Sequence, residues 1–435
     1  MALRGRRREV RDRMIQTVQP GMRAGTVHVP ASKSMAHRQL IAAALSEEPC
    51  TVICDGVSKD IEATARCMNA LGAEISYEES GNAFHVIGVE RGKEQAPEGA
   101  YFDLFCGESG TTLRFLLPLA GALGKKVLFH PEGLLSKRPM GPLVEELEKH
   151  GVRVRREDGR IASEGQLQPG EYVLPGNVSS QFISGLLISL PLLAGDSRLI
   201  ITGKIESEAY ITMTEQVLAQ AGVLLEKQGA EYRIRGGQKY RFPATVSVES
   251  DWSGAAAFLC MGALSEKGIT IPGMHLNSCQ ADEAVLDVLR EFGAEVTAAD
   301  GTVTVRKKEM KPFVMDASGA PDLVPVVSAM ACAAEGETRI IRAERLRLKE
   351  SDRLQTTVDL IRALGGEASV TEDGLLIRGS GRLHGGPADP ANDHRIAMAA
   401  AVAASVCEDA VQITDSECVG KSYPRFFEDL GKLDR

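Results

Sequence analysis

The stretch VHVPASKSMAHRQLIAAAL, residues 27–45, gathers two cations and a hydroxyl where an apolar helix is expected to begin. Its first residues follow the pattern of a strand, and its last residues are those of a buried helix. Lys33, Ser34 and Arg38 therefore stand at a helix N-terminus, whose free backbone N–H groups already favour negative charge. The stretch predicts an anion-binding site without identifying the anion.

Segments of the same kind recur along the chain. Each combines a polar start, rich in Gly, Ser or Asp, with a mostly apolar helix, which is the signature of an N-cap that leads into a buried helix. Their ends, 69 to 78 positions apart, fall near Leu45, Leu123, Leu193, Leu264, Ala333 and Ala403. This self-similarity predicts an architecture of six repeats.

A second series of motifs lies between these segments. Five amphipathic segments end at a glycine and continue as two stretches of alternating polarity, which predicts a helix, its C-cap and a hairpin. A sixth helix, RFFEDLGKLDR, has no hairpin after it, and the strand–turn–strand pattern of residues 14–30 has no helix before it. We expect this first hairpin to complete the last unit.

The α/β units divide into two domains of three. One domain is expected to be continuous over residues 32–248, and the other to combine residues 14–31 with 249–435, while the basic residues 1–13 form a disordered tail. Facing domains would direct their polar helix N-termini at a shared cleft. A repeat scaffold that binds a partner protein is the alternative, but the polar starts differ in chemistry from unit to unit, as sites do.

Composition argues against several other classes of protein. Apolar residues make up 43% of the 435 and charged residues 25%, as in globular proteins, and no apolar run reaches the ~20 residues of a membrane span. The formal net charge of −9 and the aromatic content of 5% argue against nucleic-acid binding. Nine cysteines, of which only Cys50 and Cys54 are closely spaced, are typical of reduced cytoplasmic thiols rather than of a metal site.

Seven motifs occur in order with the repeat spacing, namely SKSMAHR, GESGTTLR, KRPM, VSSQF, KESDRL, NDHRIAM and GKSYPRFF. Together they resemble the 5-enolpyruvylshikimate-3-phosphate (EPSP) synthases, the enolpyruvyl transferases of the shikimate pathway, from about Met14 to the C-terminus. The resemblance implies a two-domain inside-out α/β barrel of six βαβαββ-type repeats, three per domain.

The resemblance also implies an activity. The family transfers the enolpyruvyl group of phosphoenolpyruvate to the 5-hydroxyl of shikimate 3-phosphate and releases phosphate through a tetrahedral intermediate, in aromatic amino acid (chorismate) biosynthesis. The implied partners are these two small molecules, bound to a cytoplasmic monomer with no metal or organic cofactor, no nucleic acid and no membrane. Glyphosate is expected to compete with phosphoenolpyruvate because Gly110 is retained.

Roles for individual residues follow from the matched motifs, whose cations suit two multiply anionic substrates. Shikimate 3-phosphate is expected to contact Lys33, Ser34, Arg38, Ser179, Ser180, Gln181, Ser207, Asp322 and Lys349. Phosphoenolpyruvate is expected to contact Lys33, Gly110, Arg114, Arg138, Gln181, Arg353, Arg395 and Lys421. The expected catalytic residues are Asp322 at the 5-hydroxyl, Glu350 at C3 of phosphoenolpyruvate, Lys33 and His394.

Structural interpretations of the same residues stay open at this point. Asp322 could cap the helix that begins in GAPDLVPVV, and Glu350 could form an ordinary surface ion pair. His394 could orient a substrate or be purely structural. Tyr210 is a weaker candidate for the site.

Four positions depart from the commoner pattern of the family. Glu108 stands where asparagine is usual, and a carboxylate beside an anionic substrate needs a neutralising cation, for which Arg114 is the candidate. Ala31 replaces a frequent glycine and Glu208 a frequent lysine. Arg345 stands where some members have asparagine, and it is not assigned as a ligand.

Three rival functions were weighed against this one. The sister enolpyruvyl transferase that acts on UDP-N-acetylglucosamine uses a KN pair near its start, whereas this chain has SKS, and Cys106 does not lie in a loop comparable to that of its cysteine acid. A P-loop enzyme would need the GK[ST] ending that GESGTTLR lacks. A non-catalytic phosphate-binding repeat scaffold would keep the cations but need neither Asp322 nor Glu350.

Overall fold

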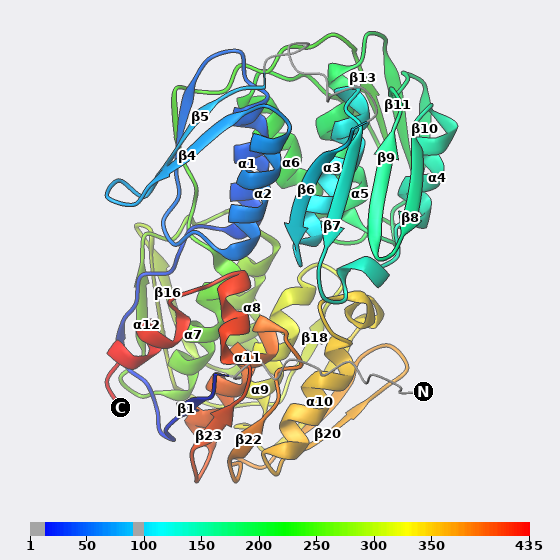
Figure 1. Ribbon diagram of the computed structural model, residues 1–435. Coiled ribbons are helices and arrows are strands. Elements are labelled where there is room, and N and C mark those ends of the chain that lie inside the picture. The colour runs from blue at the N-terminus through cyan, green and yellow to red at the C-terminus, as the bar shows by residue number, and fades with distance from the viewer. Residues whose placement is uncertain (1–13, 90–99) are drawn as a thin grey trace, which may run out of the picture.

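A computed structural model describes residues 14–89 and 100–435, arranged as two lobes stacked one above the other (Figure 1). The upper lobe contains helices α1 to α6, and the lower lobe contains helices α7 to α12. The basic segment 1–13, interpreted as a tail, lies outside the described residues. The mixed α/β fold predicted from the sequence is confirmed.

Six helices, three in each lobe, are buried along most of their length, and they are the apolar segments of the repeats. These helices are α1 (Lys33–Ala44), α3 (Gly110–Ala122), α5 (Ser180–Ser189), α7 (Trp252–Leu264), α9 (Val324–Ala331) and α11 (His394–Ala403). The helices with an exposed face are α2 (Lys59–Ala70), α4 (Gly141–Lys149), α6 (Glu208–Gln220), α8 (Val285–Phe292), α10 (Arg353–Ala363) and α12 (Phe426–Lys432).

The chain also forms short 3₁₀ helices. They are η1 (Leu135–Lys137), η2 (Leu190–Leu192), η3 (Ala281–Ala284), η4 (Pro321–Leu323), η5 (Glu344–Leu348), η6 (Ala404–Val406) and η7 (Ser416–Lys421). Helices η2, η3, η4 and η6 adjoin α5, α8, α9 and α11, and the others lie in the connections between elements. Two of these 3₁₀ helices, η4 and η5, contribute residues to the cavity described below, and η7 contains Lys421.

The strands form six sheets with one shared pairing pattern, in which the first two strands are parallel and the third is antiparallel to the second. The upper sheets are β14 (Thr245–Ser247), β3 (Cys50–Ile53), β5 (Ala83–Ile87) and β4 (Glu74–Glu78); β6 (Phe102–Gly107), β7 (Val127–Pro131), β9 (Arg160–Glu164) and β8 (Arg153–Glu157); and β10 (Glu171–Pro175), β11 (Ser197–Thr202), β13 (Glu231–Ile234) and β12 (Glu226–Gln228).

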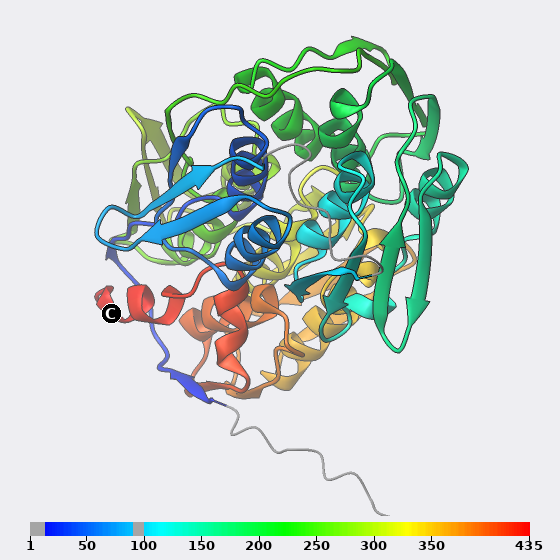
Figure 2. The same ribbon diagram turned by 45° about the horizontal axis from the view of Figure 1, so that its top comes forward.

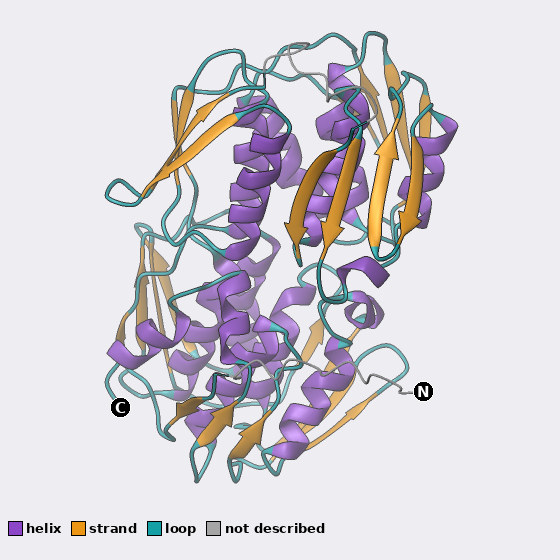
Figure 3. Ribbon diagram, viewed as in Figure 1, coloured by secondary structure: helices purple, strands orange, loops and turns teal. Residues whose placement is uncertain are grey.

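The lower lobe repeats the pattern. Its sheets are β2 (Gly25–Thr26), β15 (Ile269–Pro272), β17 (Thr302–Arg306) and β16 (Glu295–Ala299); β18 (Val314–Asp316), β19 (Gly336–Ile341), β21 (Leu375–Gly379) and β20 (Glu367–Val370); and the three-stranded β22 (Gly386–Ala388), β23 (Val411–Ile413) and β1 (Gln16–Val18). In both lobes the sheets lie at the periphery and the buried helices at the centre (Figures 2 and 3).

The five glycines predicted to end the amphipathic helices do so: Gly293 is the C-cap of α8, and the other four directly follow the C-cap residue of their helix. The five φ angles are all positive, between 72° and 103°, a region that only glycine enters without strain. The residues are Gly72, Gly151, Gly222, Gly293 and Gly365.

The prediction for the N-terminal hairpin is wrong in part. Strand β1 does complete the sheet of the last unit, where it pairs with β23. Strand β2 instead pairs in parallel with β15, in a different sheet of the lower lobe. The segment between them contains Pro20, which has no N–H to donate to a ladder, and it carries the chain from one sheet to the next.

The two lobes exchange their leading strands. Strand β2 precedes α1 of the upper lobe but belongs to a lower sheet, and β14 precedes α7 of the lower lobe but belongs to an upper sheet. The two connecting segments run side by side, because the Ser32 N–H donates to the Glu249 carbonyl (2.7 Å) and the Asp251 N–H to the Pro30 carbonyl (2.9 Å). The chain therefore passes between the lobes twice at one place.

Buried apolar residues form two separate clusters. One draws its members from Ala31 to Phe242, and the other from Val18, Val27, Val29 and the chain from Trp252 to Leu433. No helix in residues 14–89 or 100–435 combines the length and the apolar character that crossing a bilayer requires. Each lobe thus has its own core, and polar groups are concentrated where the lobes meet.

Candidate active site

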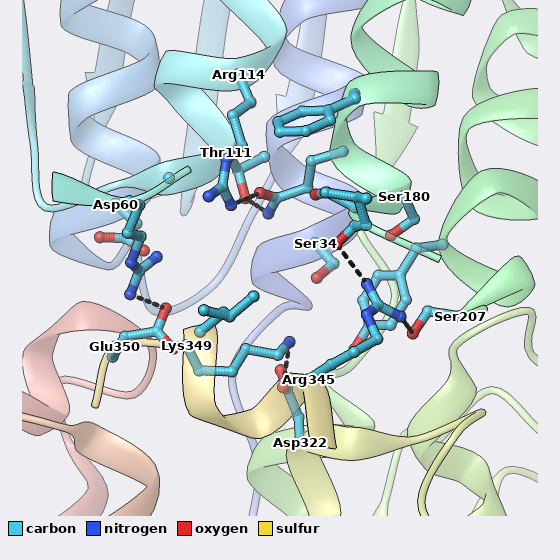
Figure 4. Close-up of a pocket in the computed structure, with 18 of the residues that line it drawn as sticks. Ser34, Asp60, Thr111, Arg114, Ser180, Ser207, Asp322, Arg345, Lys349 and Glu350 are labelled. Carbon is cyan, nitrogen blue, oxygen red and sulfur yellow. Dashed lines mark hydrogen bonds and ion pairs between the residues drawn. The ribbon is translucent and has the colours of Figure 1, made fainter. Parts of the chain in front are cut away.

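A cavity of about 120 Å³ lies where the two lobes meet (Figure 4). Seven cations line it, namely Lys33, Arg38, Arg114, Arg138, Arg345, Lys349 and Arg353. Three carboxylates line it as well, those of Asp60, Asp322 and Glu350. The cavity is therefore positively charged within a chain whose formal net charge is −9, which is the arrangement expected for anionic ligands.

The N-termini of helices from both lobes point at the cavity. Lys33, Gly110 and Ser180 are the first residues of α1, α3 and α5, and all three line it. Arg353 and His394 begin α10 and α11 on the opposite side. The repeats thus bring their free N–H donors and partial positive charges to one place.

Serine hydroxyls at two of these helix starts are not used for capping. Ser58 and Ser109 cap α2 and α3 by accepting from backbone N–H groups of the first turn. Ser179 and Ser207, which precede α5 and α6, make no such bond. Both line the cavity together with Ser34 of α1; the Ser207 hydroxyl accepts from Arg345 Nη1 at 3.0 Å and can still donate its own proton to a ligand.

The two cations of α1 are held differently. Lys33 donates to Asp60 Oδ2 of α2 at 3.0 Å. Arg38, which is almost fully buried, donates to Thr214 Oγ1 (2.8 Å) and to the carbonyl of Tyr210 (2.8 Å) on α6. Burial lowers the pKa of Arg38 to about 10, so it remains charged at neutral pH. Arg38 therefore ties α1 to α6 beside the cavity.

The upper-lobe arginines cluster around the start of α3. Arg114 Nη1 donates to Gln181 Oε1 (2.6 Å), and Gln181 Nε2 donates to Thr111 Oγ1 (2.9 Å). Burial, and then the charge of Arg138, lowers the pKa of Arg114 to about 10. A Cβ at Gly110 would lie 3.0 Å from Arg138 Nη1, so the glycine leaves room for this guanidinium.

Asp322 lies in η4 and does not act as a helix cap. Its Oδ1 accepts from Lys349 Nζ (3.0 Å) and from Arg353 Nη1 (2.9 Å). Burial raises the pKa of Asp322, but Lys349, Arg353 and Arg395 outweigh this effect and hold the pKa well below its ordinary value. The carboxylate is therefore ionised at neutral pH.

Glu350 contacts one arginine from each lobe. Its Oε2 accepts from Arg353 Nη2 at 2.7 Å, and its Oε1 lies 3.3 Å from Arg138 Nη2. Burial raises the pKa of Glu350, but Arg353 and Arg138 outweigh it, and the pKa lies well below the ordinary value. Glu350 thus forms a bridge between the lobes rather than a surface ion pair.

His394 lines the cavity and is buried. Burial, together with the charges of Lys33 and Arg395, holds its pKa well below the ordinary value. Its Nδ1 has no hydrogen-bond partner among the described residues and lies 3.7 Å from Asp393 Oδ1. The ring is therefore a neutral imidazole at neutral pH.

Two of the sequence-predicted residues do not line the cavity. Arg395 lies close to Asp322, with its Nη2 4.0 Å from Asp322 Oδ2. Lys421, in η7, donates to Glu108 Oε2 (2.9 Å) and to the Asn392 carbonyl (2.6 Å). The cation that pairs with Glu108 is therefore Lys421 rather than the Arg114 suggested by the sequence. The other fifteen predicted residues all line the cavity.

Sequence reasoning missed two charged residues of the cavity. Asp60 looks like an ordinary acidic residue in the first turn of α2, and nothing in its spacing indicates the ion pair with Lys33. Arg345 lies within the charged run ERLRLKESDR, yet its Nη1 donates to Ser207 Oγ across the cavity at 3.0 Å. For Asp60, charge complementarity within the predicted site would have been the only signal, whereas the family resemblance singles out Arg345 without assigning it as a ligand.

Comparison with known proteins agrees with this geometry. The family model described as EPSP synthase (3-phosphoshikimate 1-carboxyvinyltransferase) matches residues 18–430. The chain belongs to this family. A 3-phosphoshikimate 1-carboxyvinyltransferase of Clostridium acetobutylicum is 40% identical over 420 residues, covering 96% of each chain, and the one of Clostridium kluyveri is 38% identical over 422 residues.

Solved structures resemble the whole chain as well. The EPSP synthase of Acinetobacter baumannii matches with a TM-score of 0.78 and 27% identity, over 97% of this chain and 98% of that one. The enolpyruvyl transferase NikO of Streptomyces tendae also matches with a TM-score of 0.78, at 18% identity, which shows a shared fold. For an EPSP synthase family member, the cavity between the lobes is the candidate active site.

Proposed function

We propose that this protein transfers the enolpyruvyl group of phosphoenolpyruvate to the 5-hydroxyl of shikimate 3-phosphate and releases phosphate. Each substrate carries a phosphate and a carboxylate. The observation that supports the proposal most strongly is the cavity itself, where seven cations from both lobes surround Asp322 and Glu350. Arginine and lysine side chains bind such groups through charge-assisted hydrogen bonds. Membership of the EPSP synthase family supports the same reaction.

The shikimate 3-phosphate subsite is proposed to lie against α1, α5 and α6, closed from below by Asp322 and Lys349. Its ligands are Lys33, Ser34, Arg38, Ser179, Ser180, Gln181, Ser207, Asp322 and Lys349. The uncapped hydroxyls of Ser179 and Ser207 support this assignment. The N-terminus of α5 supplies backbone donors of the kind that phosphate groups prefer.

The phosphoenolpyruvate subsite is proposed to lie against α3 and the starts of α10 and α11. Its ligands are Lys33, Gly110, Arg114, Arg138, Gln181, Arg353, Arg395 and Lys421. Buried Nε atoms of Arg114, Arg138 and Arg395 have no hydrogen-bond partner within the part of the chain that the structure describes. These unused donors support an anion as the missing partner.

Asp322 is proposed to accept the proton of the 5-hydroxyl while the hydroxyl oxygen bonds to C2 of phosphoenolpyruvate. Its low pKa keeps the carboxylate free of protons before substrates bind. Lys349, which now donates to Asp322, would transfer to the substrate phosphate, and this loss of a cationic partner raises the basicity of Asp322. His394 would orient the substrates as a neutral imidazole.

Glu350 is proposed to deliver a proton to C3, which gives the tetrahedral intermediate, and to remove a proton from C3 as phosphate leaves. A carboxylate held by two arginines is a poor proton donor. When the anions of phosphoenolpyruvate draw Arg138 and Arg353 away, the pKa of Glu350 rises and the carboxyl can carry the proton. Substrate binding would therefore prepare the acid that the reaction needs.

Phosphate release is the direct test of this function. The purified protein should release phosphate from phosphoenolpyruvate only when shikimate 3-phosphate is present. Replacing shikimate 3-phosphate by UDP-N-acetylglucosamine tests the sister activity. A phosphate-binding scaffold would release no phosphate with either substrate, and that result would overturn the proposal.

The finer architecture belongs to the same proposal. We infer that each lobe is an inside-out α/β barrel of three βαβαββ-type repeats, and that the domains span residues 32–248 and residues 14–31 with 249–435. The two separate cores and the peripheral sheets support this division (Figure 3). A cytoplasmic monomer is proposed as well. The nine cysteines, all free thiols, support a reducing compartment.

A further inference from the structure

Glu108 joins the two lobes through a cation that the substrate is proposed to use. It lies in the upper lobe between β6 and α3, and its partners Lys421 and Asn392 belong to the lower lobe. Glu108 Oε2 accepts from Lys421 Nζ at 2.9 Å, and both carboxylate oxygens accept from Asn392 Nδ2 at 3.1 Å. The ammonium end of the pair is well buried, with 10% of the Lys421 side chain exposed against 30% for Glu108.

The surrounding backbone is shaped around this carboxylate. A Cβ at Gly133, in the turn after β7, would lie only 2.7 Å from Glu108 Oε2, and the φ of this glycine is +56°. Asn392 also has a positive φ of 56°, which turns its carbonyl toward Lys421 while its side chain holds Glu108. Glu108 is therefore held by contacts with residues of both lobes, Gly133 of the upper lobe and Asn392 of the lower lobe.

The ammonium group of Lys421 has three N–H donors, and two are already engaged. One points to Glu108 and one to the Asn392 carbonyl. We propose that Glu108 is an affinity-setting residue that neutralises Lys421 in place of the substrate anion, so that phosphoenolpyruvate competes with a carboxylate for this cation. This inference rests on the proposed function, in which Lys421 is a phosphoenolpyruvate ligand.

A second ion pair between the lobes provides a comparison at the other end of the cavity. Glu206, at the upper-lobe turn before α6, lies with its Oε2 3.4 Å from Arg345 Nε of η5. This pair adjoins Ser207, on the proposed shikimate 3-phosphate side. Removing either carboxylate breaks one ion pair between the lobes, but only the removal of Glu108 frees Lys421. The two substitutions therefore separate a role in affinity from a role in holding the lobes together.

The test is steady-state kinetics of Glu108→Gln, with Glu206→Gln as the matched control. We expect Glu108→Gln to lower the KM for phosphoenolpyruvate about threefold or more, the effect of losing one partly exposed ion-pair competitor. The KM for shikimate 3-phosphate should change by less, and Glu206→Gln should not lower the KM for phosphoenolpyruvate. Glu108→Asn, with a shorter amide, is a second variant for the same comparison.

The outcomes separate the inference from the function on which it rests. An unchanged or raised KM for phosphoenolpyruvate in both Glu108 variants would overturn the inference. Phosphate release by the wild type would still support the proposed function. A rise in the KM for both substrates would show that Glu108 only holds the lobes together, and it would overturn the inference as well. Absence of phosphate release by the wild type would overturn the function. In that case calorimetric titration with phosphoenolpyruvate tests the inference, which requires Glu108→Gln to bind phosphoenolpyruvate more tightly than the wild type does. Equal or weaker binding would overturn it.

Discussion

Glu350 is the clearest case of a side chain whose chemistry depends on its neighbours. It lies between Arg353 (2.7 Å) and Arg138 (3.3 Å), and both guanidinium groups favour its ionised form. The same arginines are the proposed ligands of phosphoenolpyruvate. At the scale of the residue, then, substrate binding and proton affinity are linked, because one set of cations serves both.

Replacing the Glu350 carboxyl by an amide separates binding from chemistry. Glu350→Gln keeps the shape of the side chain and removes a carboxylate that competes for Arg138 and Arg353, so both substrates should still bind, and phosphoenolpyruvate at least as tightly as in the wild type. Turnover should fall by about 10² to 10⁴, because an amide cannot exchange a proton with C3. Phosphate release measures turnover, and calorimetry measures binding. Near-normal turnover would remove Glu350 from the mechanism.

Asp282, in η3, predicts a pH dependence of stability. It is buried and accepts from Ser253, while its Oδ1 has no hydrogen-bond partner among the described residues. Burial, and then the charge of Asp322, raises its pKa to about 7. This pKa exceeds the ~3.9 of an unfolded aspartate, so between about pH 4 and pH 7 the folded chain binds more protons than the unfolded chain. The stability of the folded chain therefore falls as the pH rises through this range.

We therefore expect the unfolding free energy of Asp282→Asn, relative to that of the wild type, to increase as the pH is raised from 5 to 8. The change should be about 2 to 3 kcal/mol, measured as the difference in unfolding free energy from urea titrations at the two pH values. Asp287→Asn, on the exposed face of α8, is the matched control. An equal pH effect in that control would contradict the role of burial at Asp282.

Sequence alone identifies the residues that carry charge into the cavity, but not their partners. The apolar helix after Lys33 and Arg38 marks an anion site, and fifteen of the seventeen predicted residues line the cavity. Asp60 and Arg345 were missed, and Glu108 was given the wrong partner, because each of these contacts joins segments far apart in the chain. Spacing within a motif contains no information about such contacts.

At the scale of the element, α3 and α5 position the upper half of the site by packing closely against each other. Gly185, in α5, faces the backbone of α3, and a Cβ there would lie 2.6 Å from the carbonyl oxygen of Arg114. No Cβ fits at that distance, so a larger residue would push the helices apart. The contact between Arg114 and Gln181 depends on this approach.

Gly185→Ala tests the packing of these helices. We expect a loss of about 1 to 3 kcal/mol in the free energy of unfolding, the usual cost of overpacking, and a higher KM for shikimate 3-phosphate because α5 carries Ser180. Urea titration and steady-state kinetics give the two quantities. Gly431→Ala, also in a helix but with no atom within 4 Å of the added Cβ, should leave both nearly unchanged. Equal effects of the two substitutions would contradict the close approach.

The elements themselves were largely predictable, and the exception has a physical reason. The helices of the repeats and the glycines that end them could be predicted because hydrophobic periodicity and backbone preference are local properties of the sequence. Strands β1 and β2 have only three and two residues. Strands this short have little preference of their own, and tertiary contacts decide that they join different sheets.

At the scale of the whole molecule, four ion pairs connect the lobes within the part of the chain that the structure describes. They are Glu108 with Lys421 (2.9 Å), Arg138 with Glu350 (3.3 Å), Arg345 with Glu206 (3.4 Å) and Arg425 with Asp55 (3.3 Å). The exposed pair of Arg425 with Asp55 is worth about 0 to 1 kcal/mol and is screened by salt, and the half-buried pairs offset their Coulomb attraction by the cost of desolvating both charges. Contacts of this kind hold the lobes together only weakly, which is suitable for lobes that must admit a ligand.

We expect shikimate 3-phosphate to draw the lobes together, because its anionic groups bridge cations on both. The radius of gyration from small-angle X-ray scattering should decrease on saturation, and the decrease should be larger at high salt, where the ion pairs of the free protein are screened. Shikimate without the phosphate is the control ligand. A radius that stays constant on saturation at every salt concentration would contradict closure.

The placement of β1 has a consequence for how the chain is made on the ribosome. The Met14 carbonyl accepts from Ser416 Oγ, 402 positions later, and β1 pairs with β23. At about 5 to 20 residues per second, these N-terminal residues emerge roughly 20 to 80 seconds before their partner is synthesised. The upper lobe can fold in that interval, whereas the earliest segment, with exposed Met14 and Ile15, must wait unpaired. The last sheet of the lower lobe can therefore be completed only after residues 411–413 have been synthesised.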